Sequence, residues 1–209
     1  MKMIVLCGPQ GSGNHLFGKI FSMHPDVHGW KDALKPDGYF IPHYKEPFNY
    51  YWNNIDKIDK DIMGGKAFAV TSISVPYIEK WQPKIPPITD FINSCEKINI
   101  NCQLVIIGRD QNILTYQQTR LRGGPSWGCM AQLLQNIKQP PFFISQELLY
   151  LYRRQYIKSL GQLLNFPLAW DDPHVDEILK QDANAKYIHA ADPCWLDDHV
   201  KTISTPPKD

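Results

Sequence analysis

A glycine-rich segment near the N-terminus carries the residues best suited to chemistry. Residues 8–15, the glycine loop, read Gly-Pro-Gln-Gly-Ser-Gly-Asn-His; an apolar run at residues 3–7 precedes them and an amphipathic stretch follows. Glycines let the backbone curl so that successive N–H groups point inward, and a following helix adds unpaired N–H groups and the positive end of its dipole. The sequence therefore predicts a phosphate-binding loop between a strand and a helix. A tight turn that holds no ligand is the alternative.

The loop departs from the nucleotide triphosphatase pattern at two positions. Gly8 and Gly13 have the Walker A spacing, G-x-x-x-x-G, but Asn14 and His15 stand where those enzymes have Lys and Ser or Thr. We expect the Asn14 and His15 side chains to donate to phosphate oxygens. Without the lysine, the loop lacks the compact cation that neutralises developing charge during group transfer. This argues against ordinary ATP or GTP hydrolysis.

Arg109 is the second candidate for a ligand contact. It directly follows residues 103–108, the clearest buried strand pattern in the chain. A guanidinium at that strand end suits bidentate capture of a phosphate or carboxylate. The alternative is a surface arginine that pairs with Asp110 or a helix end. Arg120 and Arg122, further along the same helical stretch, are expected to be solvated.

Residues 25–51 are rich in Pro, Gly, His and aromatic residues and show no sustained periodicity, so we expect an irregular segment where binding residues often lie. Glu46 in this segment is a candidate general base towards an acceptor hydroxyl, and His43 is the second choice. An ordinary surface pair between Lys45 and Glu46 is an equal alternative. The histidines match no metal-ligand spacing, so no metal site is predicted.

Aromatic residues cluster in the same segment. They are Tyr39, Phe40, Tyr44, Phe48, Tyr50, Tyr51 and Trp52. Core packing beneath a long loop is the expectation for them, and a substrate or adenine pocket is the alternative. Core packing is also expected for Trp127 and Trp170.

Composition predicts one globular domain at residues 1–201 with a flexible tail at 202–209. The chain has 209 residues, 43% of them hydrophobic, and a net charge of +1, so no overall field attracts nucleic acid or an anionic membrane. Its five cysteines are scattered and show no C-x-x-C pattern, which favours a reducing cytoplasm over a disulfide framework or a zinc site. No apolar stretch approaches membrane-spanning length.

The elements that must position these residues alternate along the chain. Strands are expected at residues 3–7, 67–75, 103–108 and 142–145. Helices are expected after the glycine loop to about residue 23, around 88–95 and from 110 to about 122. Two more are expected, one between the break at residues 123–125 and residue 137 and one over 148–164. This alternation predicts an α/β fold with a mainly parallel central sheet flanked by helices. Ligands of such sheets bind outside the carboxyl ends of the strands, where both the glycine loop and Arg109 would lie.

The chain resembles sulfotransferases that use 3′-phosphoadenosine 5′-phosphosulfate (PAPS). The glycine loop, the helix and then Met-His-Pro-Asp resemble the opening of that family, and a strand ending in Arg109-Asp110 resembles its second signature. A Lys-Glu-Pro-Phe and a later strand–helix unit also match. The matching stretches fall within roughly residues 3–180, in the family's order: residues 8–15, 23–26, 45–48, 104–110, 142–148 and 161–166.

The resemblance implies a P-loop-type three-layer sandwich, PAPS as donor, PAP as product and no metal. It places Gln10, Gly11, Ser12, Gly13, Asn14 and His15 at the 5′-phosphosulfate. It also places Arg109 at the 3′-phosphate, with Gln117 at the position of the family's partner serine. The implied reaction is in-line transfer of a sulfuryl group to a hydroxyl or amine of an unknown small-molecule or carbohydrate acceptor. Glu46 or His43 would be the base, and His15 with the loop amides would stabilise charge on the leaving phosphate.

Two departures from the family pattern keep other functions open. Gly11 replaces the family's loop lysine, and Asn14 and His15 replace its paired threonines. Lys19 and Lys45 are candidate substitutes for that lysine, with Lys19 expected to point outward. One alternative is a non-catalytic phosphonucleotide-binding protein. The other is a small-molecule or nucleotide kinase with a degenerate loop, in which Asp110 would hold Mg²⁺.

Overall fold

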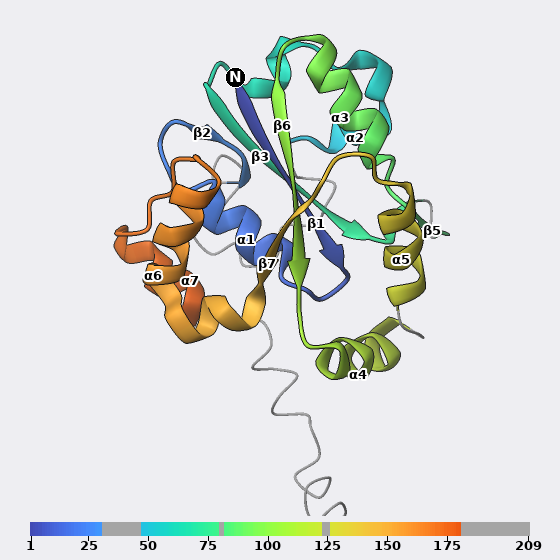
Figure 1. Cartoon of the computed structure of the whole chain (residues 1–209), viewed down its shortest axis with the longest axis vertical. Coiled ribbons are helices and arrows are strands. Elements are labelled where there is room, and N and C mark those ends of the chain that lie inside the picture. Colours follow the sequence, from blue (N-terminus) through green and yellow to red (C-terminus); the bar gives the residue numbers. More distant parts are fainter. Residues whose placement is uncertain (31–46, 80–81, 123–125, 181–209) are drawn as a thin grey trace, which may run out of the picture.

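The computed structural model describes residues 1–30, 47–79, 82–122 and 126–180, without the side chains of residues 78, 79 and 120–122. Their centre is a parallel sheet of five strands in the order β2-β3-β1-β6-β7 (Figure 1). The strands are β1 (Lys2–Pro9), β2 (Val27–His28), β3 (Phe68–Val75), β6 (Asn101–Gly108) and β7 (Phe142–Ser145). The four predicted strands are confirmed. The sequence pattern missed β2, because two residues are too few to show a period.

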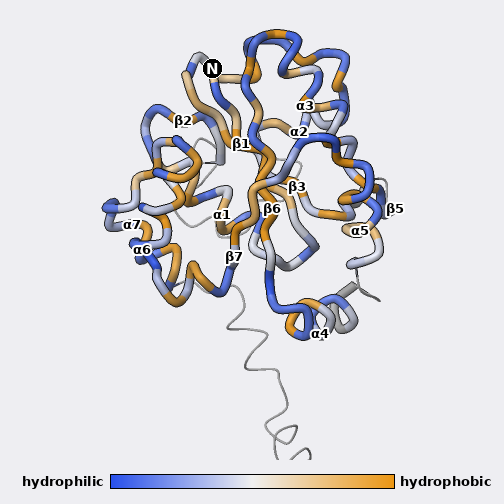
Figure 2. The backbone as a smooth tube through the Cα atoms, viewed as in Figure 1, coloured by the Kyte–Doolittle hydropathy of each residue, from blue (hydrophilic) through white to orange (hydrophobic). Residues whose placement is uncertain are grey.

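Helices cover both faces of the sheet, as an α/β fold requires. Met3, Val5 and Cys7 face one helical layer, and Ile4 and Leu6 face the other, because side chains alternate along a strand. The first layer holds α2 (Asn49–Asn53), α3 (Ile88–Lys97) and α5 (Trp127–Asn136). The second layer holds α1 (Asn14–Phe21), α6 (Gln146–Leu163) and α7 (Pro173–Lys180). Because both faces are buried, the strands are apolar along most of their length (Figure 2).

Strand β1 is the point at which the order of the sheet reverses. From β1 the chain first builds β2 and β3 on one side, then returns through α3 to place β6 on the other. Gly8 of β1 is opposite Ser74 of β3, and Cys7 is opposite Ile106 of β6, so the carboxyl ends of the three strands meet. Such a switch point leaves a crevice at the carboxyl edge of an open α/β sheet.

Several elements differ from the predictions. The proline-rich connection after β3 contains an antiparallel pair, β4 (Tyr77–Glu79) and β5 (Gln82–Lys84). Within the described part of residues 25–51 the chain forms β2 and begins α2, and the short helices η3 (Ile55–Lys57) and η4 (Lys60–Met63) follow. The helix expected over 148–164 is α6, which begins at Gln146 and is interrupted at Arg153, where φ is 45°. Helix α7 was not predicted.

The aromatic residues divide between core and surface. Trp52 stacks on Phe91 with ring centroids 3.9 Å apart, and Phe48 is fully buried, so core packing is confirmed for Phe48 and Trp52. It is wrong for Trp127 and Trp170, which are 60% and 37% exposed. Trp127 projects outward because the buried face of α5 carries Met130 and Leu133. Tyr50 is exposed, and Tyr39, Phe40 and Tyr44 lie outside the described residues.

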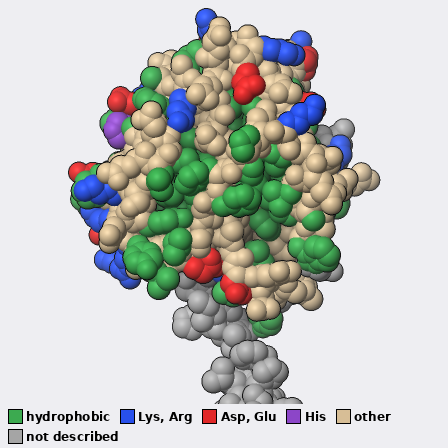
Figure 3. Space-filling model, in the orientation of Figure 1, with side chains coloured by type: hydrophobic (Ala, Val, Ile, Leu, Met, Phe, Trp, Pro, Cys, Tyr) green, Lys and Arg blue, Asp and Glu red, His purple; other side chains and the backbone are tan. Residues whose placement is uncertain are grey.

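Apolar side chains also gather on the face of the molecule that Figure 3 shows, along which β7 runs in Figure 1. Phe143 of the edge strand and Leu151 and Tyr152 of α6 are among the exposed large apolar residues.

The described cysteines, Cys7, Cys95, Cys102 and Cys129, are free thiols. In the part of the chain that the structure describes, every helix is too short or too polar to cross a lipid bilayer. Cys194 and the predicted tail at 202–209 lie outside the described residues.

Candidate functional site

The glycine loop joins β1 to α1 at the switch point of the sheet. Gly11 and Gly13 have φ angles of 92° and 98°, which lie in the left-handed region that favours glycine. The N–H of Ser12 donates to the carbonyl oxygen of Pro9 at 3.0 Å and closes a turn. No side chain of the described residues caps the start of α1, and its first turn contains no acidic residue. The positive dipole end of α1 therefore faces the carboxyl edge of the sheet with no acidic residue in the first turn of the helix.

Asn14 holds this loop together from inside. Its side chain is buried, and Nδ2 donates to the carbonyl oxygen of Gly8 and to Oγ of Ser74, both at 3.1 Å. Ser12 Oγ donates to Oδ1 of Asn14 at 3.5 Å. Since an amide nitrogen carries two hydrogens, both hydrogens of Asn14 already have acceptors within the protein. The structure thus places Asn14 as a tie between the glycine loop and β3.

Two glutamines fasten the loop on its other side. Nε2 of Gln10 donates to the carbonyl oxygen of Pro76 at 2.7 Å. The carbonyl oxygen of Gln10 in turn accepts from Nε2 of Gln118 at 2.6 Å, and Oε1 of Gln118 accepts from the N–H of Ser126 at 2.6 Å. Gln118 lies in α4 (Gln111–Arg122). Sequence reasoning missed it, because a glutamine in a polar helix carries no signal of such a role.

Arg109 and Gln117 meet against the glycine loop. Nη1 of Arg109 donates to the carbonyl oxygen of Gly11 at 2.6 Å and to Oε1 of Gln117 at 3.0 Å. The two residues are eight positions apart, so Gln117 lies about two turns along α4 from the end of β6. A Cβ atom on Gly11 would lie 2.9 Å from Oε1 of Gln117. Gln117 therefore fills the space beside Gly11, and Arg109, which bonds both residues, brings a permanent positive charge to the loop.

His15 is half-buried near the start of α1. Its ring packs against Trp30 with centroids 4.8 Å apart and an angle of 41° between the rings. Trp30 is fully buried, and its Nε1 donates to Oγ of Ser72 at 3.0 Å. This packing holds the His15 ring beside the loop. The base candidates Glu46 and His43, and Lys45 as well, lie outside the described residues.

Lys19 corrects one expectation. Its side chain is only 6% exposed rather than pointing outward. The reason is that Phe17, Gly18, Lys19, Ile20 and Phe21 are all buried, so the second half of α1 has almost no solvent face. Desolvation lowers the pKa of the Lys19 ammonium below its ordinary value.

The junctions after β6 and β7 are joined to each other. Oδ1 of Asp110 accepts from the N–H groups of Asn112 and Ile113 and caps α4. Glu147 accepts from the N–H of Asp110 through Oε1 and from Oγ of Ser145 through Oε2, both at 2.8 Å. One oxygen of the Asp110 carboxylate, the candidate Mg²⁺ ligand of a kinase, is thus engaged as a helix cap. An open surface depression of about 560 Å³ lies beside this cap, lined by Asp110, Gln111, Asn112, Thr115, Tyr116 and Thr119.

Gln146 completes the site from the end of β7. It is the first residue of α6, is 3% exposed, and packs against Gly13 at the start of α1. Its Oε1 has no hydrogen-bond partner among the described residues. The sequence placed Gln146 directly after a strand, which was the one signal that could have identified it.

The described residues offer no candidate metal site, and the comparisons with known proteins find no relative. Within the described residues, no three His, Cys, Asp or Glu side chains lie close enough together to hold a metal ion. No protein-family model matches the chain, and a search of curated proteins finds no match.

Proposed function

We propose that this chain is a sulfotransferase-like protein of the P-loop type that binds PAPS at the carboxyl edge of its sheet. One observation carries the proposal: Arg109, at the end of β6, donates to the carbonyl oxygen of Gly11 in the glycine loop at 2.6 Å. A cation and a helix N-terminus thereby meet at the switch point. That combination suits a ligand with several anionic groups.

The glycine loop would hold the 5′-phosphosulfate. Its left-handed glycines and the start of α1, which no described side chain caps, present backbone N–H groups and a positive dipole end. Asn14, Gln10 and Gln118 support this proposal by fastening the loop to β3 and α4. A loop that is already rigid loses little conformational entropy when an anion binds.

Arg109 would serve the 3′-phosphate, which distinguishes PAPS from ATP. Its guanidinium presents five N–H donors, of which those on Nη1 bond Gly11 and Gln117. The same charge lies beside Gly11, where the resembled family carries its loop lysine. Arg109 therefore offers a source of the positive charge that the loop itself lacks.

The proposed reaction is an in-line sulfuryl transfer. The acceptor oxygen or nitrogen forms a bond to the PAPS sulfur as the bond from sulfur to the bridging oxygen breaks, and the electron pair leaves on PAP. The acceptor proton would pass to Glu46 or His43, and the loop amides with His15 would stabilise the leaving phosphate. The acceptor is a small molecule or carbohydrate that offers a hydroxyl or amine.

A non-catalytic phosphonucleotide-binding protein is the second candidate. Gly11 favours it, because the loop has no lysine to stabilise the leaving oxygen. The two engaged hydrogens of the Asn14 amide favour it as well, since they leave that side chain no donor for the transferring group. Release of PAP from PAPS, in the presence of a panel of hydroxyl and amine acceptors, distinguishes this candidate from a sulfotransferase.

Calorimetric titration of the whole chain with PAP, ATP, ADP and AMP, with and without Mg²⁺, tests the donor site. We expect PAP to bind without metal at micromolar affinity, on the order of −8 kcal/mol, and the other nucleotides to bind far more weakly. Equal affinity for ADP and PAP would contradict a site that recognises the 3′-phosphate. Tight ATP binding only with Mg²⁺ would instead indicate a kinase.

A further inference from the structure

A buried amide oxygen beside the glycine loop has no hydrogen-bond partner among the described residues. Gln146 is 3% exposed, and its Oε1 is one of three buried side-chain atoms without a partner among the described residues. Most buried polar side-chain atoms in folded proteins are hydrogen-bonded, and each exception calls for a physical explanation. Gln146 also stands at the carboxyl end of a strand, where ligands bind in this class of sheet.

The surroundings of this amide indicate what it would bind. A Cβ atom on Gly13 would lie 3.3 Å from Cδ, 3.4 Å from Nε2 and 3.6 Å from Oε1 of Gln146. The amide therefore lies directly against the N-cap residue of α1, where no side chain of the described residues caps the helix. The positive dipole end of α1 favours an anion at this place, and an anion accepts hydrogen bonds.

The neighbouring carboxylate does not compete for the same place. Both oxygens of Glu147 are engaged, with the N–H of Asp110 and with Oγ of Ser145, at 2.8 Å each. The group that faces Gly13 is thus an uncharged amide rather than a carboxylate. A carboxylate there would repel a bound anion, whereas an amide can turn its NH₂ group towards it.

We infer that Gln146 is a further anion-binding residue of the glycine loop, whose Nε2 donates to a phosphate or sulfate oxygen seated at the start of α1. The inference rests on the anion site of the proposed function. Rotation of the amide by 180° exchanges its donor and acceptor at no cost in shape. After that rotation Nε2 occupies the place at which Oε1 has no donor, and a bound anion would accept its hydrogen bond.

Substitution by methionine separates a ligand role from a structural one. Gln146→Met keeps the side-chain length and removes the unpartnered amide, so the ligand-free variant should be at least as stable towards urea as the wild type. Its affinity for PAP and for inorganic pyrophosphate should fall about 10- to 100-fold, which corresponds to one charge-assisted hydrogen bond. Gln146→Glu should weaken both ligands further, because its carboxylate faces the anion.

Gln139→Met is the matched control. Oε1 of Gln139 is also buried without a partner, but Gln139 precedes β7 and so lies at the opposite end of that strand from the loop. Its variant should share the stability change and leave both affinities within about twofold of the wild type. Equal loss of affinity in the two variants would overturn the inference.

The two ligands separate failure of the inference from failure of the proposed function. If the wild type binds PAP and Gln146→Met binds it equally well, the role of Gln146 is overturned and the proposed function stands. Wild-type binding of pyrophosphate but not PAP, lost in Gln146→Met, overturns the proposed function and supports the role of Gln146. Binding of neither ligand by the wild type overturns both. A loss of stability in ligand-free Gln146→Met, with affinity unchanged, would assign the amide to packing.

Discussion

At the scale of residues, the polar side chains of the site form hydrogen bonds within the protein itself. Asn14 bonds Gly8 and Ser74, and Arg109 bonds Gly11 and Gln117. These contacts fix the shape of the glycine loop before any ligand arrives. Preorganised donors and charges of this kind stabilise an anion without a reorganisation step.

Arg109 offers the most direct test at this scale, because its two roles have different consequences. Loss of the bond to Gly11 would loosen the loop and weaken every nucleotide alike, whereas loss of a 3′-phosphate contact would weaken only PAP. We expect Arg109→Ala to raise the dissociation constant of PAP at least about tenfold more than that of AMP, measured by calorimetry.

Gln117→Ala is the control for that experiment. It removes the partner of the guanidinium but keeps the charge, so it should weaken PAP by a smaller factor than Arg109→Ala does. An equal loss for PAP and AMP in Arg109→Ala would show that Arg109 acts only by holding the loop.

At the scale of elements, α1 packs so closely against Trp30 that position 18 leaves no room for a Cβ atom. A Cβ atom on Gly18 would approach Cδ1 and Nε1 of Trp30 to 2.9 Å and Oγ of Ser72 to 3.3 Å. Trp30 has little room to move, since it is fully buried and its Nε1 bonds Ser72. Glycine at position 18 thus sets the distance between α1 and the sheet, and with it the position of the glycine loop.

A pair of glycine substitutions tests this packing by urea unfolding. Gly18→Ala should lower the free energy of unfolding by about 1–3 kcal/mol, because overpacking outweighs the better helix propensity of alanine. Gly128→Ala in α5 has no atom within 4 Å of the new Cβ and should instead gain up to about 1 kcal/mol. Equal stability of the two variants would show that Trp30 moves aside freely.

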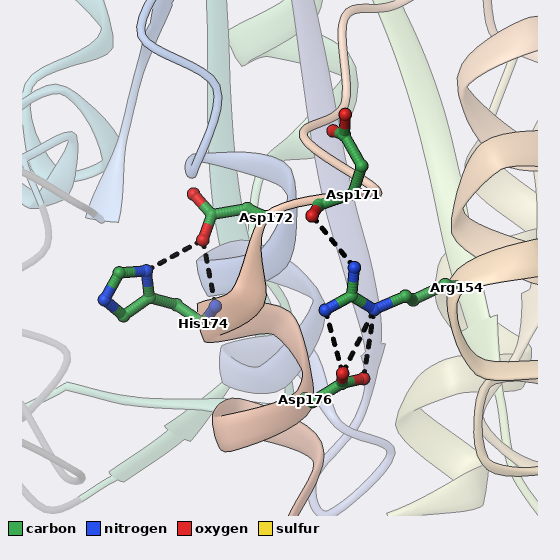
Figure 4. A network of polar contacts seen from close by, with 5 residues as sticks. All are labelled: Arg154, Asp171, Asp172, His174 and Asp176. Carbon is green, nitrogen blue, oxygen red and sulfur yellow. Dashed lines mark hydrogen bonds and ion pairs between the residues drawn. The ribbon is translucent and has the colours of Figure 1, made fainter.

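Helix α7 is fastened to α6 by a surface network (Figure 4). The Arg154 guanidinium donates to the Asp176 carboxylate, from Nη2 at 2.8 Å and from Nε at 3.2 Å, and to the carbonyl oxygen of Asp171 at 2.8 Å. Asp172 accepts from the backbone N–H of His174 and lies 2.7 Å from Nδ1 of that ring. The hydrogen bond from Arg154 lowers the pKa of Asp176 below its ordinary value.

This shift predicts how the fastening depends on pH. A lowered pKa in the folded state contributes stability that is present above the ordinary Asp pKa and lost as pH falls through the lowered value. The stability difference between wild type and Asp176→Asn should therefore be small but measurable at pH 7, since both side chains of the pair are partly exposed, and should vanish on acidification from about pH 4 downwards. Thermal unfolding of both proteins across this range measures it. A difference that stays constant down to pH 2 would rule out the ion pair as its source.

At the scale of the whole molecule, Cys7 reports on opening of the entire sheet. It lies fully buried in β1, the central strand, and burial raises the pKa of its thiol to about 12. At pH 8 the reactive thiolate is therefore scarce even apart from access. Partly exposed Cys129 in α5 should react rapidly with an alkylating reagent, whereas Cys7 should react only through global unfolding.

Ligand binding should then protect Cys7 in proportion to affinity. Under the proposed function PAP would bind only the folded chain, so PAP at about 100 times its dissociation constant should slow Cys7 labelling by about 100-fold, or about 2.7 kcal/mol. Labelling of Cys129 is the internal control and should change little. The coupling would be contradicted if Cys7 were labelled as fast as Cys129, or if PAP did not change the rate of Cys7 labelling.

The sequence by itself determined the features that depend on local patterns. Apolar runs identified β1, β3, β6 and β7, and alternation with helices predicted their parallel sheet. The glycines identified the loop between β1 and α1, because left-handed backbone at Gly11 and Gly13 needs that residue type. Arg109 was singled out because it follows a strand. Each of these inferences needs only the residue and its neighbours in the chain.

The tertiary structure decided which side chains are engaged with which. Asn14 and Ser74 are 60 positions apart, and Arg109 and Gly11 are 98 apart, so no local pattern records their contacts. Burial of Lys19 and exposure of Trp127 likewise depend on which helix faces the neighbouring layers cover. Gln146 is the clearest case, because an amide is ordinary in any sequence. Its Oε1 is buried without a described partner because the end of β7 packs against the start of α1. Burial and hydrogen bonding there depend on every chain segment that packs at this place.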